Sequence, residues 1–117
     1  MMTPQARQAL EESDVIAGYP VYLKLLGDLV QSKKTIATPM TKEEERCRLC
    51  FEEAKKGCIA SIVCSGDSGV YGMASLMYDL LPEYPGCELE IIPGITAAVS
   101  GAAVLGAPIG HDFCVIS

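Results

Sequence analysis

The chain of 117 residues contains no tryptophan, only two phenylalanines and a single histidine. Positive charge is also scarce, because nine Lys and Arg residues face fifteen Asp and Glu residues, for a formal net charge of -6 at pH 7. Proteins that bind nucleic acids usually present a basic stripe, often with interleaved aromatic side chains. The lack of both features argues against a nucleic-acid partner.

The sequence also lacks a long unbroken hydrophobic run. The longest stretch without Asp, Glu, Lys or Arg, residues 91–111, contains Pro93, Pro108 and several glycines, so it does not predict a membrane span. No basic segment precedes an apolar one at the amino terminus, so no secretory signal is expected and the cytoplasm is the expected compartment. The six cysteines are then expected to be free thiols.

One Cys-x-x-Cys pair, Cys47 and Cys50, has a spacing found in zinc sites. Zinc needs about four ligands, however, and the only histidine, His111, lies far along the chain without a second Cys-x-x-Cys. Together with Phe51 the pair forms the apolar side of a helix expected over residues 42–56. We therefore expect no metal site. The remaining cysteines are interpreted as small buried hydrophobic residues: Cys58, Cys64, Cys87 and Cys114.

Apolar runs bounded by turn residues alternate with helical patterns along the whole chain, whose length suits one domain. This alternation predicts an α/β fold with a mainly parallel sheet of about five strands flanked by helices. Thr3 followed by Pro4 predicts the start of the first helix, and Gly57 predicts the end of the helix over residues 42–56. The expected strands are 15–19, 35–38, 59–64, 88–92 and 113–116, and the expected helices are 3–12, 21–30, 42–56, 70–81 and 95–105.

The most informative segment is 62–74, where an apolar run gives way to a loop with three glycines and one acid, Asp67. The order of strand, loop and helix places this loop at the carboxyl end of a strand, where open α/β sheets bind ligands. Glycine lets the backbone approach a ligand closely, and Asp67 can accept hydrogen bonds from a ribose or an amino group. The alternative is that Gly-Asp-Ser-Gly merely turns the chain.

A second segment of the same kind follows the expected strand 88–92. Pro93 and Gly94 turn the chain before a helix whose first turn carries Thr96. Free backbone N–H groups and a hydroxyl there can bind a polar ligand, although Thr96 taken alone is better explained as a helix cap. Two such loops on neighbouring βα units predict one ligand held between them.

These two segments, Ser-Gly-Asp-Ser-Gly-Val-Tyr-Gly at 65–72 and Ile-Pro-Gly-Ile-Thr-Ala at 92–97, resemble the paired signature of the tetrapyrrole methylase family of S-adenosylmethionine-dependent enzymes. The resemblance covers nearly the whole chain. It implies a two-domain protein that binds S-adenosyl-L-methionine in the cleft between its domains, with the tetrapyrrole substrate above the cofactor. Residues 1–117 would be the single N-terminal domain of this fold, without its first strand, its Gly-x-Gly-Pro-Gly loop and its C-terminal domain. The resemblance also implies that the protein forms a homodimer.

Within the family, the segments 66–74, 40–46 and 106–113 are similar to enzymes of cobalamin biosynthesis that methylate C17 of precorrin-3B, or of its cobalt analogue, with ring contraction. The resemblance does not decide whether the substrate contains cobalt. It implies that six residues bind the cofactor. Ser65, Gly66 and Asp67 would contact its methionine and ribose parts. Val70 would pack on it, and Thr96 with Ala97 would complete this half of the pocket.

No general acid or base can be assigned from the sequence. Tyr19, Lys24, Tyr71 and His111 are the available groups, but buried tyrosines and a lone histidine are more often structural. Lys24 is best placed by sequence to meet a carboxylated substrate. Because the chain is acidic, most of the positive field must come from the missing half or from a partner subunit.

Two alternatives stay open at this point. The chain could belong to a methyltransferase of the same fold that acts at another precorrin position or on a non-tetrapyrrole substrate, or it could be a noncatalytic α/β fragment whose glycine loops are only turns. Without the first loop and the second domain, the chain alone is expected to bind cofactor weakly or not at all.

Overall fold

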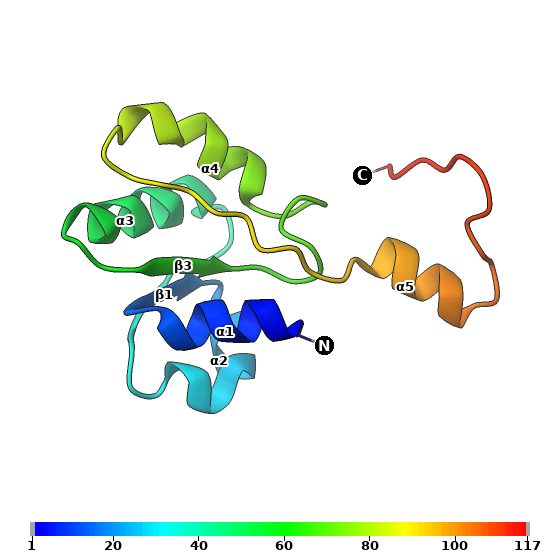
Figure 1. Cartoon of the computed structure of the whole chain (residues 1–117), viewed down its shortest axis with the longest axis horizontal. Coiled ribbons are helices and arrows are strands. Elements are labelled where there is room, and N and C mark those ends of the chain that lie inside the picture. Colours follow the sequence, from blue (N-terminus) through cyan, green and yellow to red (C-terminus); the bar gives the residue numbers. More distant parts are fainter. Residues whose placement is uncertain (1, 117) are drawn as a thin grey trace.

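The computed structural model describes residues 2–116, in which helices cover both faces of a small parallel sheet (Figure 1). Short 3-10 turns, η1 and η2, extend two of the helices. In chain order the elements are α1 (Pro4–Glu12), β1 (Val15–Gly18), α2 (Pro20–Leu26), η1 (Gly27–Val30), β2 (Lys34–Ala37), α3 (Glu43–Lys55), β3 (Ala60–Val63), α4 (Ala74–Leu80), η2 (Leu81–Glu83) and α5 (Ala97–Val104).

The sheet has three parallel strands in the order β2-β1-β3. Val15 of the central strand lies opposite Lys34 of β2 and Ala60 of β3. Every residue of β1 is buried, because this strand has a neighbour at each edge and helices on both faces. The carboxyl ends of all three strands therefore meet at one edge of the sheet.

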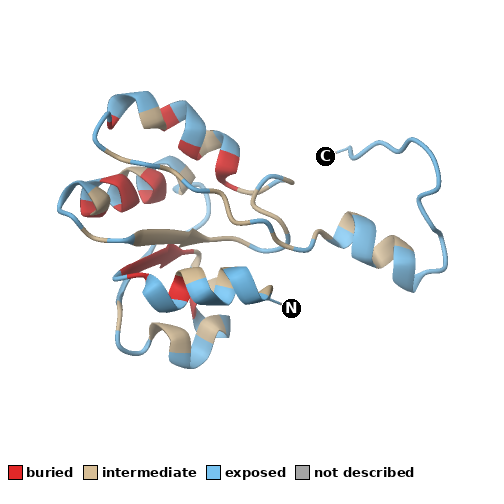
Figure 2. Ribbon diagram, viewed as in Figure 1, coloured by how far each residue is buried: buried red, intermediate tan, exposed pale blue. Residues whose placement is uncertain are grey.

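Each face of the sheet has its own hydrophobic cluster. Leu10, Ile16 and Leu23 form the cluster under α1 and α2. On the other face α3 and α4 pack together, and the rings of Phe51 and Tyr84 stack with their centroids 4.6 Å apart. The buried members of this second cluster are Cys47, Phe51, Met73, Met77, Leu80 and Tyr84. Figure 2 shows that the buried residues gather in these layers around the sheet.

Local signals place the ends of α1 and α3 as the sequence predicts. The Thr3 hydroxyl oxygen accepts the Ala6 backbone N–H at 3.1 Å, and Pro4 occupies the first turn of α1. The chain leaves α3 through Gly57, whose φ of 90° lies in the left-handed region. Both predictions are confirmed.

The prediction of about five strands is wrong, because residues 88–92 and 113–116 are not paired in the sheet. Residues 86–92 run alongside β3 in the same direction (Figure 1), but a groove of about 740 Å³ lies between the two backbones. Cys87 and Leu89 pack instead against the cluster of α3 and α4. Residues 113–116 lie beyond α5, exposed and away from the sheet, so they have no neighbouring strand with which to pair.

The expectation for the cysteines holds only in part. All six are free thiols, and Cys47 and Cys50 are buried as expected. Cys58, Cys64 and Cys87 are only half-buried, and Cys114 is exposed. The reason is the same as for the strands, since the segments around these four cysteines lack the neighbours that a larger sheet would provide.

α5 and the residues after it extend away from the layers formed by the rest of the chain (Figure 2). Val104 and Leu105, at the end of this helix, are 87% and 83% exposed. Within residues 2–116 no helix combines the length and the apolar character that crossing a membrane requires.

Candidate functional site

Two loops meet at the carboxyl edge of the sheet. The first, here called the glycine loop, is residues 64–73 between β3 and α4; the second, the proline-glycine loop, is residues 93–96 before α5. They touch through backbone, since a Cβ added to Gly94 would lie 2.0 Å from the carbonyl oxygen of Gly66 and 3.2 Å from Cα of Asp67. Only glycine fits at position 94 in this arrangement.

Asp67 joins the two loops. Its Oδ1 accepts the backbone N–H of Gly94 at 2.7 Å, and its Oδ2 accepts the backbone N–H of Gly69 at 2.9 Å. These hydrogen bonds lower the pKa of the Asp67 carboxyl group below its usual value, and the bond from Gly94 has the larger effect. A second link runs from the Ser68 hydroxyl to the carbonyl oxygen of Ile92, at 3.2 Å.

The glycine loop is tightly folded, and α4 begins at Ala74 rather than at the predicted position 70. The Ser68 carbonyl oxygen accepts the Ala74 N–H at 3.0 Å, which closes the loop before the helix starts. Gly72 packs so closely that an added Cβ would lie 2.3 Å from that same carbonyl oxygen. Tyr71 adopts a φ of 52°, which is uncommon for a bulky residue, and its side chain is exposed.

The six residues predicted to form the site lie in the two touching loops or directly after them. Ser65, Gly66, Asp67 and Val70 share the glycine loop, and a Cβ on Gly66 would lie 3.9 Å from Cα of Thr96 in the other segment. Ala97 follows directly as the first residue of α5.

Thr96 acts as the cap of α5, as the simpler interpretation of the sequence holds. Its hydroxyl oxygen accepts the Ala98 backbone N–H at 3.3 Å. This bond uses the oxygen as an acceptor and leaves the hydroxyl proton available to a ligand. Capping and ligand binding are therefore compatible at Thr96.

Sequence reasoning missed Tyr22 of α2. The hydroxyl of Ser65 donates to the Tyr22 hydroxyl oxygen at 3.2 Å, and the ring of Tyr22 meets that of Tyr19 edge-on at 5.7 Å between centroids. No local signal marks Tyr22, because it comes near Ser65 only when α2 packs beside β1. The aromatic pair borders the glycine loop on the side of α2.

A third loop at the same edge, residues 38–42, follows β2. Together with the first turn of α3 it contains the segment 40–46, on which part of the resemblance rests. Arg46 of α3 is 4% exposed and holds this loop in place. Its Nε donates to the Thr38 hydroxyl at 2.8 Å, and its guanidinium also donates to the carbonyl oxygens of Thr38 and Pro39, at 3.1 and 3.3 Å. The same group donates to the sulfur of Met73, at the end of the glycine loop, at 3.2 Å.

The groups considered as acids or bases are scattered. Lys24 is exposed in the last turn of α2, and His111 is exposed in the extended segment after α5. Tyr19 is the residue before α2, and Tyr71 is exposed in the glycine loop. The geometry of this chain assigns none of them as an acid or base.

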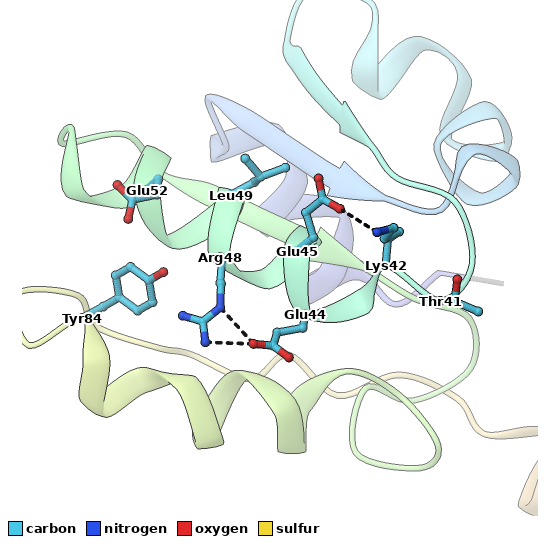
Figure 3. A pocket seen from close by; sticks show the side chains of 8 residues that line it. All are labelled: Thr41, Lys42, Glu44, Glu45, Arg48, Leu49, Glu52 and Tyr84. Carbon is cyan, nitrogen blue, oxygen red and sulfur yellow. Dashed lines mark hydrogen bonds and ion pairs between the residues drawn. The ribbon is translucent and has the colours of Figure 1, made fainter.

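A shallow hollow of about 530 Å³ lies elsewhere, on the side of α3 that faces η2 (Figure 3). Arg48 forms ion pairs there with Glu44 and Glu83, at 2.9 and 3.0 Å. The hollow is lined by Thr41, Lys42, Glu44, Glu45, Arg48, Leu49, Glu52 and Tyr84. It contains none of the six predicted site residues, and its acidic side chains are already paired or solvated, so it is not the candidate site.

The chain is thus an α/β protein whose glycine loop, at the carboxyl end of β3, is joined to a second loop at the same edge of the parallel sheet. Comparison with family models agrees: residues 1–117 match the model of the Tetrapyrrole (Corrin/Porphyrin) Methylases, and the chain belongs to this family. It is 45% identical to cobalt-factor III methyltransferase of Priestia megaterium, over 99% of this chain and 22% of that protein. It is 41% identical to a probable cobalt-factor III C(17)-methyltransferase of Salmonella typhimurium, over 100% of this chain and 49% of that protein.

Among solved structures, the methyltransferase CobJ is similar with a TM-score of 0.89 and 39% sequence identity. The match covers 97% of this chain and 48% of CobJ. The chain thus spans half or less of the length of these relatives. Because nearly the whole chain is matched, the overall arrangement of the chain corresponds to that in CobJ.

Proposed function

We propose that this chain is the N-terminal domain of an S-adenosylmethionine-dependent C-methyltransferase of cobalamin biosynthesis. In this proposal the full-length protein methylates C17 of cobalt-factor III, or of its metal-free counterpart precorrin-3B, with ring contraction. The observation that carries the proposal is the contact between the glycine loop and the proline-glycine loop. The two segments on which the resemblance rests meet through their backbones and through the bond between Asp67 and Gly94. Relatives that are 41–45% identical along the whole or nearly the whole chain are named as cobalt-factor III methyltransferases, which supports the proposed substrate.

The cofactor is assigned to the two joined loops. Ser65, Gly66 and Asp67 would contact its methionine and ribose parts, Val70 would pack on it, and Thr96 with Ala97 would complete this half of the pocket. The residues fit such a ligand in three ways. Gly66 has a φ of 69° and an exposed backbone, the Thr96 hydroxyl keeps its proton free, and the Ala97 N–H lies in the first turn of α5, where helices leave donors unpaired.

The bound cofactor supplies an electrophilic methyl group, activated by its sulfonium. The protein then has to align this group with an electron-rich carbon of the substrate and exclude water. In this chain the rigid backbone of the joined loops orients the cofactor, and the Tyr19–Tyr22 pair borders the site beside Ser65.

The substrate is a polycarboxylate, whereas this chain carries a net charge of -6. Lys24 is the exposed cation on α2 that we assign to the substrate side. The rest of the positive field is assigned to the remainder of the protein or to the partner subunit of a homodimer. This division explains how an acidic domain serves an acidic substrate.

The competing functions have less support. Methylases of the same fold that act on other substrates share the glycine loops, but the relatives at 41–45% identity are named for cobalt-factor III. A noncatalytic fragment would not need Gly94 and Gly66 in backbone contact. The acidic charge argues against an RNA substrate.

Two measurements test the proposal. Calorimetric titration of the full-length protein with S-adenosylhomocysteine tests the site: Asp67→Asn should weaken binding, and Glu52→Gln is the matched control. Glu52 is exposed on α3, outside both loops, so the same carboxylate-to-amide change there should leave affinity unchanged. Transfer of a labelled methyl group to C17 of cobalt-factor III by the full-length protein tests the reaction. Binding of the cofactor product with methylation at another ring position would contradict the assigned substrate position.

A further inference from the structure

The carboxylate of Asp67 is already engaged in the folded chain. One oxygen accepts the N–H of Gly69 within its own loop, and the other accepts the N–H of Gly94, 27 residues further along the chain. A turn of the chain at Asp67 would need only the first of these bonds. The second crosses to the other loop, and the Ser68–Ile92 bond crosses beside it.

We infer that Asp67 is a positioning residue whose carboxylate fixes the spacing between the glycine loop and the proline-glycine loop, and that it does not bind the ribose of the cofactor. This inference rests on the proposed function, because the ligand between the loops is the one assigned there. Any contact that Asp67 makes with the cofactor is then made by its backbone. The sequence alone suggested the opposite role for the side chain, as an acceptor for a ribose or an amino group.

The physical reason is the cost of turning the carboxylate away. Hydrogen bonds to a charged acceptor are strong. The bond from Gly94 is partly buried, so water is a poorer substitute for the carboxylate there than at the exposed N–H of Gly69. Moving the Asp67 carboxylate to a ribose would leave the N–H groups of Gly69 and Gly94 without it. It would also release the contact between Gly94 and Gly66 that sets the loop spacing.

The first experiment follows the amide protons of Gly69 and Gly94 by NMR during acid titration of the 117-residue chain without ligand. Both signals should shift with one common inflection, below the ordinary aspartate pKa of about 3.9. The inflection should vanish in Asp67→Asn and persist in Glu52→Gln. A Gly94 signal that does not follow Asp67 would overturn the inference, because the link between the loops would be absent in solution.

The second experiment combines the variant with a change of ligand. Affinities are measured for S-adenosylhomocysteine and for an analogue that lacks both ribose hydroxyls, in the full-length wild-type protein and in its Asp67→Asn and Asp67→Ala variants. We expect Asp67→Ala to weaken binding of S-adenosylhomocysteine roughly 10- to 100-fold. Asp67→Asn should weaken it less, since an amide oxygen can still accept the Gly94 N–H.

The decisive quantity is the coupling between the two changes. If Asp67 only positions the loops, removing the hydroxyls should weaken binding by the same factor in wild type and in Asp67→Ala, which has no side-chain acceptor, within about twofold. A ribose ligand would instead lose the hydroxyl effect in the variant, and that result would overturn the inference. If the full-length wild-type protein binds no S-adenosylhomocysteine, the proposed cofactor site fails, while the amide titration still decides whether Asp67 joins the loops. Circular dichroism confirms that each variant is folded.

Discussion

Replacing Gly94 with alanine tests the contact between the two loops directly. The new Cβ would lie 2.0 Å from the Gly66 carbonyl oxygen and 3.1 Å from the Gly66 carbonyl carbon, both of which are backbone atoms that no rotamer change can move. The loops must therefore separate by more than 1 Å before ordinary contact is restored, roughly the misplacement that is already costly for a binding site. The 2.7 Å bond from the Gly94 N–H to Asp67 cannot survive this separation.

The size of the effect follows from the overlap. Separation of the loops relieves it but breaks the hydrogen bond to the partly exposed Asp67 carboxylate, which water replaces in part. We expect the free energy of unfolding of Gly94→Ala to fall by about 1–3 kcal/mol, the usual cost of adding atoms to a packed contact. A ligand that needs both loops at their original spacing should bind roughly 10- to 100-fold more weakly.

Gly101→Ala is the matched control. Gly101 lies within α5, and nothing lies within 4 Å of a Cβ built there. Alanine in a helix interior is favoured over glycine by about 0.5–1 kcal/mol, so this variant should be as stable as wild type or slightly more stable. Urea denaturation followed by circular dichroism gives the stabilities, and calorimetry of the full-length protein and its variants with S-adenosylhomocysteine gives the affinities. A Gly94→Ala chain with the wild-type urea midpoint and affinity would refute the close contact between the loops.

Further predictions concern buried groups. Burial raises the pKa of Cys47 to about 11 and that of Cys50 to about 12. In the native chain these two thiols should therefore react slowly with a disulfide reagent at pH 8, whereas the exposed Cys114 should react rapidly. After denaturation all six thiols should react. Because the folded chain keeps these protons after the unfolded chain has lost them, stability should fall as pH rises from 9 towards 11, and constant stability over this range in urea titrations would count against the burial. Arg46→Lys removes the planar donor group that holds the loop after β2, and should lower the free energy of unfolding by about 2–3 kcal/mol. The control is Arg7→Lys, in an exposed ion pair of α1, which should change this free energy by less than about 0.5 kcal/mol. Equal urea midpoints for the two variants would contradict the prediction.

The sequence predicted best those features that depend on neighbouring residues in the chain. The cap at Thr3, the glycine that ends α3 and the buried strand β1 all follow from local patterns. The start of α4 was misplaced because Tyr71 takes a left-handed conformation that is ordinarily reserved for glycine. Residues 88–92 are extended as expected, but a strand also requires a partner, and pairing is not a local property.

The candidate site shows the same division. Its loops could be predicted because glycine, proline and an acid mark them in the sequence. Their mutual contact could not, since the bond between Asp67 and Gly94 joins residues 27 positions apart. Tyr22 was missed for the same reason, because only the packing of α2 brings it to Ser65. The sequence predicts that the Asp67 carboxylate binds a ligand, whereas in the structure this carboxylate accepts hydrogen bonds from the protein itself.

The groove beside β3 also determines how this chain behaves in solution. β3 is paired through one edge only, so alternate amides of this strand face the groove and should exchange with solvent deuterium much faster than those that face β1. An open strand edge is also a template for pairing with another chain. Self-association of the purified chain is therefore expected to increase with its concentration and to slow exchange of the same amides. The exchange rate of these β3 amides then reports how far the chain has self-associated.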